Sequence, residues 1–122
     1  MKIGISSTGE DLNAQVDRRF GRCSYFLIVD TDTMHFESIS NASAMASGGA
    51  GIQAAQSVAK VGVEVVVTGN MGPNAFQTLS AAGIRVFTGA NGTVKEVVEK
   101  YKKGELKEAA APNVGSHSGM RR

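Results

Sequence analysis

Basic side chains and the single thiol of this chain lie close together in the segment 17–23, whose sequence is DRRFGRC. Guanidinium groups stay charged and offer several N–H donors, so Arg18, Arg19 and Arg22 suit an anionic ligand. These arginines would also lower the pKa of an exposed Cys23 thiol, and a thiolate can coordinate a metal. The alternative is that the arginines form a solvated face and that Cys23 is a small buried hydrophobic residue.

Two glycine-rich segments offer a second set of anion contacts. The segment 47–51 (SGGAG) precedes a predicted helix, and the segment 69–74 (GNMGPN) joins a predicted strand to the next helix. Amides at a helix start carry about half a positive charge in aggregate, which favours an anion, and glycine lets the backbone approach a ligand closely. The alternatives are a flexible loop for the first segment and a tight turn with a proline at the helix start for the second.

The elements that must position these segments follow from apolar patterning. Continuous apolar runs and alternating patterns predict strands, and helical periodicity between glycines predicts helices. The strands are expected at 2–6, 24–30, 34–40, 64–68 and 84–88, and the helices at 52–61, 75–82 and 93–103, with a further helical fragment at 105–111.

This order of elements predicts an α/β fold, specifically a three-layer α/β/α sandwich around a mixed five-stranded sheet. The segments 24–30 and 34–40 form a hairpin, which puts an antiparallel strand into the sheet, and the later strands are joined by right-handed parallel crossovers. Ligands of such sheets collect at the carboxyl ends of the parallel strands, so we expect the three chemistry-bearing segments to converge there. We assign 1–108 to one domain and 109–122, which includes His117, to a flexible polar tail.

Composition narrows the possible classes of function. The chain has 122 residues, enough for one domain, and a net charge of +2, which is too mild for a general nucleic-acid binder. A single cysteine and a polar N-terminus without a signal peptide predict a cytoplasmic protein. No apolar run approaches the ~20 residues of a membrane span, so no membrane partner is expected.

Known catalytic patterns are absent from the sequence. It contains no GxGxxG fingerprint after the first strand, no P-loop, no CxxC and no HExxH. A two-metal nuclease would need a carboxylate in the first strand, and the segment 2–6 (KIGIS) has none. We therefore expect no catalytic residues and predict that the protein is not an enzyme.

Five motifs occur in an order that resembles one family, the dinitrogenase iron–molybdenum cofactor biosynthesis family. They are MKIGIS, RRFGRCSYFLIVD, ASGGAGIQAAQ, VVVTGNMGPNAFQTLSAAGIRVF and GTVKEVVEKYKKGEL, and together they span residues 1 to about 107. The resemblance implies a ribonuclease H-like fold. The family includes nitrogenase accessory proteins that hold cofactor precursors and a protein that carries a molybdenum–copper sulfide cluster.

The family's FGR element falls on Phe20, Gly21 and Arg22, and its glycine-containing turn falls on 69–75. Many members have a histidine implicated in cluster binding just before the FG pair. This chain has Arg19 there, which favours an electrostatic cradle over direct metal ligation.

Taken together, residues and resemblance predict a non-enzymatic carrier or scaffold related to nitrogen fixation. Its ligand would be an anionic metal–sulfide cluster, either an Fe–Mo–S precursor or a Mo–Cu–S cluster, which isolation of the protein can remove, and its partners would be cluster-assembly or acceptor proteins. The alternatives are a protein-interaction or regulatory module without a cluster, or a nuclease. The predicted binding residues are Arg19, Gly21, Arg22, Cys23, Ser47, Gly48, Gly49, Gly69, Asn70, Met71, Gly72 and Asn74, with Cys23 as the metal ligand.

Overall fold

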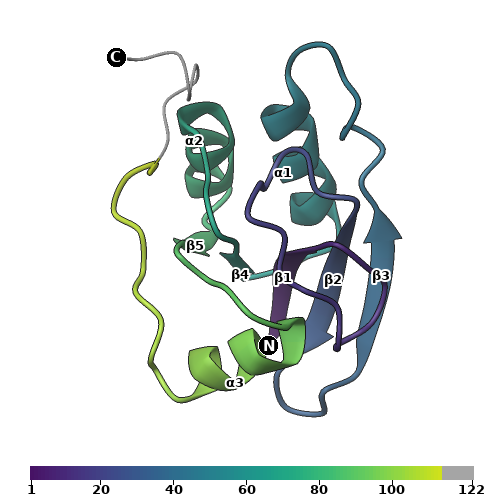
Figure 1. The fold of residues 1–122 in the computed structure, drawn as a ribbon. Coiled ribbons are helices and arrows are strands. Elements are labelled where there is room, and N and C mark those ends of the chain that lie inside the picture. The colour runs from purple at the N-terminus through teal and green to yellow at the C-terminus, as the bar shows by residue number, and fades with distance from the viewer. Residues whose placement is uncertain (114–122) are drawn as a thin grey trace.

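Five strands form one mixed sheet in the computed structural model, which describes residues 1–113 (Figure 1). The strand order across the sheet is β3-β2-β1-β4-β5. The β1–β2 and β2–β3 pairs are antiparallel, whereas β1–β4 and β4–β5 are parallel. The strands are β1 (Lys2–Ser7), β2 (Tyr25–Asp30), β3 (Phe36–Ser40), β4 (Val65–Val67) and β5 (Arg85–Phe87).

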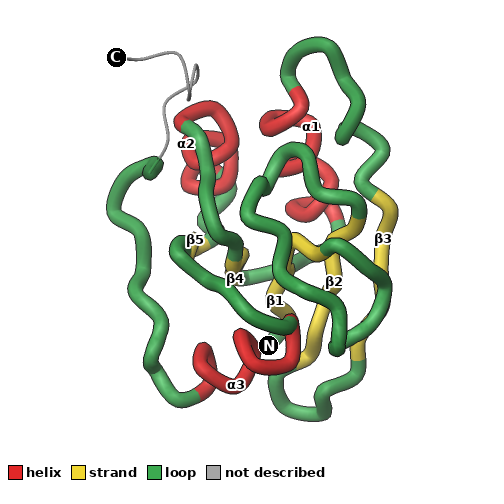
Figure 2. Tube along the Cα trace, viewed as in Figure 1, coloured by secondary structure: helices red, strands yellow, loops and turns green. Residues whose placement is uncertain are grey.

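Helices cover both faces of this sheet. Helices α1 (Ala50–Lys60) and α2 (Pro73–Ala81) lie side by side on one face, and α3 (Val94–Lys102) lies on the other (Figures 1 and 2). Alternate residues of the strands feed two separate cores, so Val66 packs toward α1 and α2 while its neighbours Val65 and Val67 pack toward α3. The mixed five-stranded α/β architecture predicted from the sequence is confirmed.

Each of the two helices on the first face begins two residues earlier than expected. Helix α1 starts at Ala50 and α2 starts at Pro73, so that Gly49 and Gly72 become their N-cap residues. Proline is well tolerated at this position because its missing N–H would have had no intrahelical acceptor. Two of the glycines expected to line a ligand, Gly49 and Gly72, therefore lie at the helix starts themselves.

The helix predicted at 105–111 is wrong. This stretch leaves α3 at Gly104 and runs along the edge of the sheet, as the yellow part of the ribbon shows (Figure 1). Glu108 forms an antiparallel bridge with Phe87, and the Ala109 N–H donates to the Val86 carbonyl oxygen at 2.8 Å. An edge strand offers unpaired backbone groups, and pairing with them outweighs the weak helical preference of an alanine-rich segment.

The last described residues pack against the domain rather than leaving it, because Asn113 hydrogen-bonds the turn after β4. The remainder of the predicted tail, with His117, lies outside the described residues. Within residues 1–113, no helix has both the length and the apolar character that crossing a membrane requires.

Candidate anion-binding site

A pocket of about 370 Å³ lies where the N-termini of α1 and α2 meet the segment 19–22. The structure thus brings together parts of all three segments that the sequence analysis selected. The pocket is lined by Arg19, Phe20, Gly21, Arg22, Gly49, Ala50, Gly51, Ile52, Asn70, Gly72, Pro73, Asn74 and Ala75.

Close contacts between small residues hold the pocket walls together. A Cβ atom on Gly21 would lie 3.1 Å from the Cα of Gly51, and a Cβ on Gly51 would lie 3.4 Å from the Cβ of Ala75. Gly51 belongs to α1 and Ala75 to α2, so the two helix starts and the arginine segment touch through positions with little or no side chain. Larger residues there would separate the walls.

A second close approach fixes the turn after β4 against the arginine segment. A Cβ on Gly69 would lie only 2.8 Å from the Cα of Arg18. The Asn70 N–H donates to the Arg18 carbonyl oxygen at 2.7 Å, and the Phe20 N–H donates to the Asn70 carbonyl oxygen at 3.3 Å. These bonds form a short parallel bridge between Arg19 and Asn70, and both residues line the pocket.

The two helix starts at the pocket have no side-chain cap. Gly49 caps α1 with a φ of 72° and Gly72 caps α2 in an extended conformation, and neither helix has an acidic residue in its first turn. Helix α3, away from the pocket, instead has a complete capping box between Thr93 and Glu96. The amides at the starts of α1 and α2 therefore remain available to an anion in the pocket.

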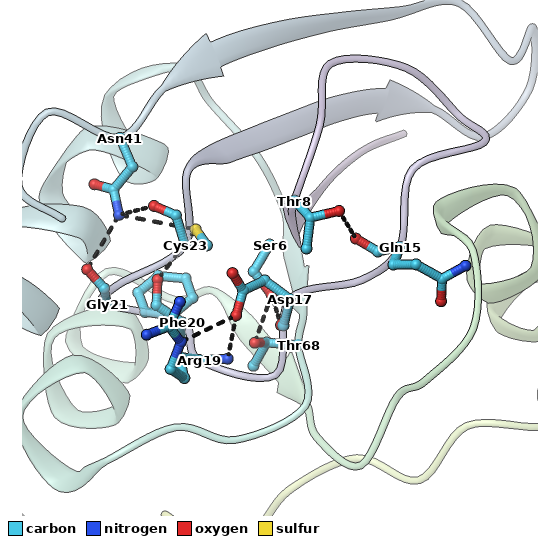
Figure 3. Close-up of polar contacts among 10 residues, drawn as sticks. All are labelled: Ser6, Thr8, Gln15, Asp17, Arg19, Phe20, Gly21, Cys23, Asn41 and Thr68. Atoms are coloured by element: carbon cyan, nitrogen blue, oxygen red, sulfur yellow. Dashed lines mark hydrogen bonds and ion pairs between the residues drawn. The ribbon is translucent and has the colours of Figure 1, made fainter.

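The two arginines of the pocket have different surroundings. Arg19 has a 67% exposed side chain, and its Nε lies 3.4 Å from Asp17 Oδ1 (Figure 3). Arg22 uses Nη1 to donate to the carbonyl oxygens of Ala44 and Ala46, at 2.9 and 2.6 Å. Arg22 thus fastens the loop before α1 to the pocket. Among residues 1–113, the pocket lining includes these two arginines and no acidic residue, so its formal charge is positive.

The predicted role of Cys23 as a thiolate ligand required an exposed thiol, and the thiol is buried. Its thiol is 0% exposed and donates to the Phe20 carbonyl oxygen at 3.4 Å, beside the Asn41 side chain (Figure 3). Burial raises the pKa of this thiol to about 12, so it is neutral at physiological pH. Cys23 packs in the core as a small hydrophobic residue, and the expected thiolate ligand is absent from the pocket.

The other predicted site residues divide into two groups. Arg19, Gly21, Arg22, Gly49, Asn70, Gly72 and Asn74 line the pocket. Of the rest, Met71 is 1% exposed in the core, Gly69 is buried against Arg18, and Ser47 and Gly48 are exposed on the loop outside the lining.

Sequence reasoning missed two asparagines that support the site. Asn41, buried at the end of β3, donates through Nδ2 to the carbonyl oxygens of Gly21 and Cys23, at 3.1 and 2.9 Å (Figure 3). Asn113 bonds the turn after β4. A polar residue directly after a strand was the only signal for Asn41, and Asn113 lies in a segment that the analysis assigned to a tail.

The donors at this pocket are N–H groups, which bind anions and not bare cations. Within the described part of the chain, no group of three or more His, Cys, Asp or Glu side chains lies in a position to hold a metal ion. The class of site that fold and geometry define is an electropositive pocket at the helix-start edge of a mixed α/β sheet.

The chain belongs to the dinitrogenase iron–molybdenum cofactor family, whose model matches residues 1–104. The apo form of the orange protein from Desulfovibrio gigas is 45% identical, with a TM-score of 0.90 over 92% of this chain and 95% of that one. A candidate NifB protein from Thermotoga is 38% identical, with a TM-score of 0.74 over 88% and 91%. An uncharacterized protein of Methanocaldococcus jannaschii is 27% identical over 99 residues, or 79% of this chain and 84% of the relative.

Replacing Gly69 with alanine tests the close approach to Arg18. We expect Gly69→Ala to lower the free energy of unfolding by about 1–3 kcal/mol, because the backbone must shift to admit the methyl group. Gly48→Ala is the matched control, since nothing lies within 4 Å of its Cβ position, and it should change stability by less than about 1 kcal/mol. Urea unfolding measures both, and equal effects would contradict the packing described.

The buried thiol predicts a pH dependence of stability. The pKa of Cys23 rises from 9.0 to about 12 on folding, so the unfolded chain loses this proton first as the pH increases. The neutral thiol therefore makes its full contribution to the free energy of unfolding below pH 9, and this contribution is lost progressively toward pH 12. Between pH 8 and pH 10 the free energy of unfolding of the wild type, measured in urea, should fall by about 1.4 kcal/mol more than that of Cys23→Ala. Parallel pH profiles of the two proteins would contradict a buried neutral thiol.

Proposed function

We propose that this protein is a non-enzymatic carrier or scaffold that binds an anionic metal–sulfide cluster, or a precursor of one, in the pocket between α1 and α2. The observation that carries the proposal is the meeting of two uncapped helix starts with Arg19 and Arg22 in one pocket. Amide and guanidinium N–H groups are donors, and a cluster with a negative charge and exposed sulfides supplies acceptors.

Membership of the dinitrogenase iron–molybdenum cofactor family supports the class of cargo. An Fe–Mo–S precursor or a Mo–Cu–S cluster brings its own sulfide ligands, so the protein needs to supply charge and shape more than metal-coordinating side chains. The similarity to an orange protein that was determined in an apo form supports a cargo that can leave. Cluster-assembly or acceptor proteins would then be its partners.

The fold assignment is part of the same proposal. We assign the domain to the ribonuclease H-like type, which the order β3-β2-β1-β4-β5 with two antiparallel and two parallel pairings supports. The wide range of functions on any such fold means that the site, and not the fold, supports the carrier role.

The pair Gly72→Asp and Gly72→Asn tests the function through binding of tetrathiomolybdate, with and without Cu(I), to the apo-protein. Wild type should bind stoichiometrically and become coloured. Gly72 has φ −83° and ψ 175°, a backbone conformation open to other residues, and both replacements supply a side-chain cap to α2. A carboxylate about 8 Å from an anion costs about 2 kcal/mol at an effective dielectric constant of about 20, so Gly72→Asp should bind at least about tenfold more weakly.

Gly72→Asn is the matched control, because it has nearly the same shape without the charge. Because its side chain also caps α2 and takes amide donors from the anion, Gly72→Asn should bind more weakly than wild type, and Gly72→Asp should bind about tenfold more weakly than Gly72→Asn. Both variants should change stability by only a few tenths of a kcal/mol. Equal affinities for the Asp and Asn variants would remove the electrostatic basis of the proposal. Absence of stoichiometric binding to the wild type would overturn the proposal itself.

A further inference from the structure

Asn113 makes four hydrogen bonds to the turn that follows β4, although it is far from this turn in the sequence. Its N–H donates to the Met71 carbonyl oxygen at 3.1 Å, and its Oδ1 accepts from the Met71 N–H at 2.8 Å. Its Nδ2 donates to the Gly69 carbonyl oxygen at 3.3 Å and to Asn70 Oδ1 at 3.1 Å. Asn113 therefore contacts Gly69, Asn70 and Met71, the first three residues of the segment 69–74.

Backbone groups determine which way the Asn113 carboxamide faces. The Met71 N–H can only donate, so the atom of Asn113 beside it must be the oxygen. The Gly69 carbonyl can only accept, so the atom beside that carbonyl must be the nitrogen. The orientation of the Asn113 side chain is thus fixed at both ends by groups that cannot exchange roles.

This fixed orientation in turn determines the orientation of Asn70. Because Asn113 Nδ2 is a donor, the Asn70 atom that it contacts must be the acceptor Oδ1. The carboxamide nitrogen of Asn70 is then at the other end of the group, and within residues 1–113 no acceptor receives a hydrogen bond from it. Asn70 itself lines the pocket between α1 and α2.

We propose that Asn113 is a positioning residue, which turns the donor end of the Asn70 carboxamide toward an anion in the pocket. This inference rests on the proposed function and adds a residue to it. A free asparagine side chain can present either its oxygen or its nitrogen, and the oxygen would repel an anionic sulfide cluster. Asn113 removes that choice before the ligand arrives, which is preorganisation of the site.

The chain between α3 and Asn113 is fastened so that it can deliver this side chain. The Ala109 N–H bonds the Val86 carbonyl oxygen on β5 at 2.8 Å. Arg85 Nη2 donates to Glu108 Oε1 at 2.7 Å, one strand residue earlier. These contacts run along the edge of β5 and bring Asn113 to the turn after the adjacent strand β4. The extended path of this segment therefore has a function at the pocket.

The test compares wild type with Asn113→Asp for binding of tetrathiomolybdate. Aspartate still accepts from the Met71 N–H but has no N–H to offer Asn70 Oδ1. The Asn70 carboxamide should then rotate to donate to the new carboxylate and present its oxygen to the pocket. We expect roughly tenfold weaker binding of tetrathiomolybdate.

Asn70→Ala separates this rotation from the charge that aspartate adds. In the Asn70→Ala background no carboxamide can rotate and only the added charge remains, so Asn113→Asp should weaken binding by at least about threefold less than it does in the wild type. A double-mutant cycle from the four proteins gives the coupling between the two residues. An Asn113→Asp penalty of the same size in both backgrounds would overturn the proposal, because the effect would then come from charge alone.

Side-chain amide exchange in the apo-protein gives a readout independent of binding. In ¹⁵N NMR spectra of wild type, the Asn113 NH₂ group should exchange slowly and the Asn70 NH₂ group rapidly. In Asn113→Asp the Asn70 NH₂ group should become protected. An Asn70 NH₂ group already protected in the wild type would overturn the orientation alone, whereas a wild type that fails to bind tetrathiomolybdate would overturn the proposed function.

Discussion

The site depends on the close packing of three residues, in which Gly21 contacts Gly51 and Gly51 contacts Ala75. This packing joins the arginine segment to the start of α1, and the start of α1 to the start of α2. The approach of Gly21 to Gly51 is too close for a Cβ atom to fit without a shift, so main-chain atoms form this part of the pocket wall. Gly69 extends the same principle to the turn after β4, where it lies against Arg18. Removing any of these close approaches would separate the groups that create the positive potential.

The same arrangement costs stability locally. Helix α3 satisfies its first amides with Thr93 and Glu96, whereas α1 and α2 begin at Gly49 and Gly72 without a side-chain cap. A glycine at the N-cap typically costs a few tenths of a kcal/mol relative to a residue with a good capping side chain. Local rules of stability are commonly broken where a protein binds something. In this protein the uncapped starts are those at the pocket, where an anion would supply the missing acceptors.

Much of the fold followed from local patterns, because buried strands such as β4 are short continuous apolar runs and each helix ends near a glycine. The meeting of the glycine segments with the arginine segment was predicted correctly, since helix starts gather at one edge of such a sheet. Pairing of the segment at Glu108 with β5 was not predictable, because edge pairing is decided by tertiary structure. The same holds for the burial of Cys23 and for the contacts of Asn41 and Asn113, which join residues distant in the sequence.

The most direct test of the account is a titration of the ¹⁵N-labelled apo-protein with tetrathiomolybdate, followed by the backbone amide resonances. If the pocket binds the anion, the largest shifts occur at the first amides of the two helices, including Gly51 and Ala75. The amides of Lys102 and Gly104, which border a separate pocket at the C-terminal end of α3, should remain unchanged. Shifts centred on Lys102 and Gly104, or an absence of saturable shifts at Gly51 and Ala75, would contradict it.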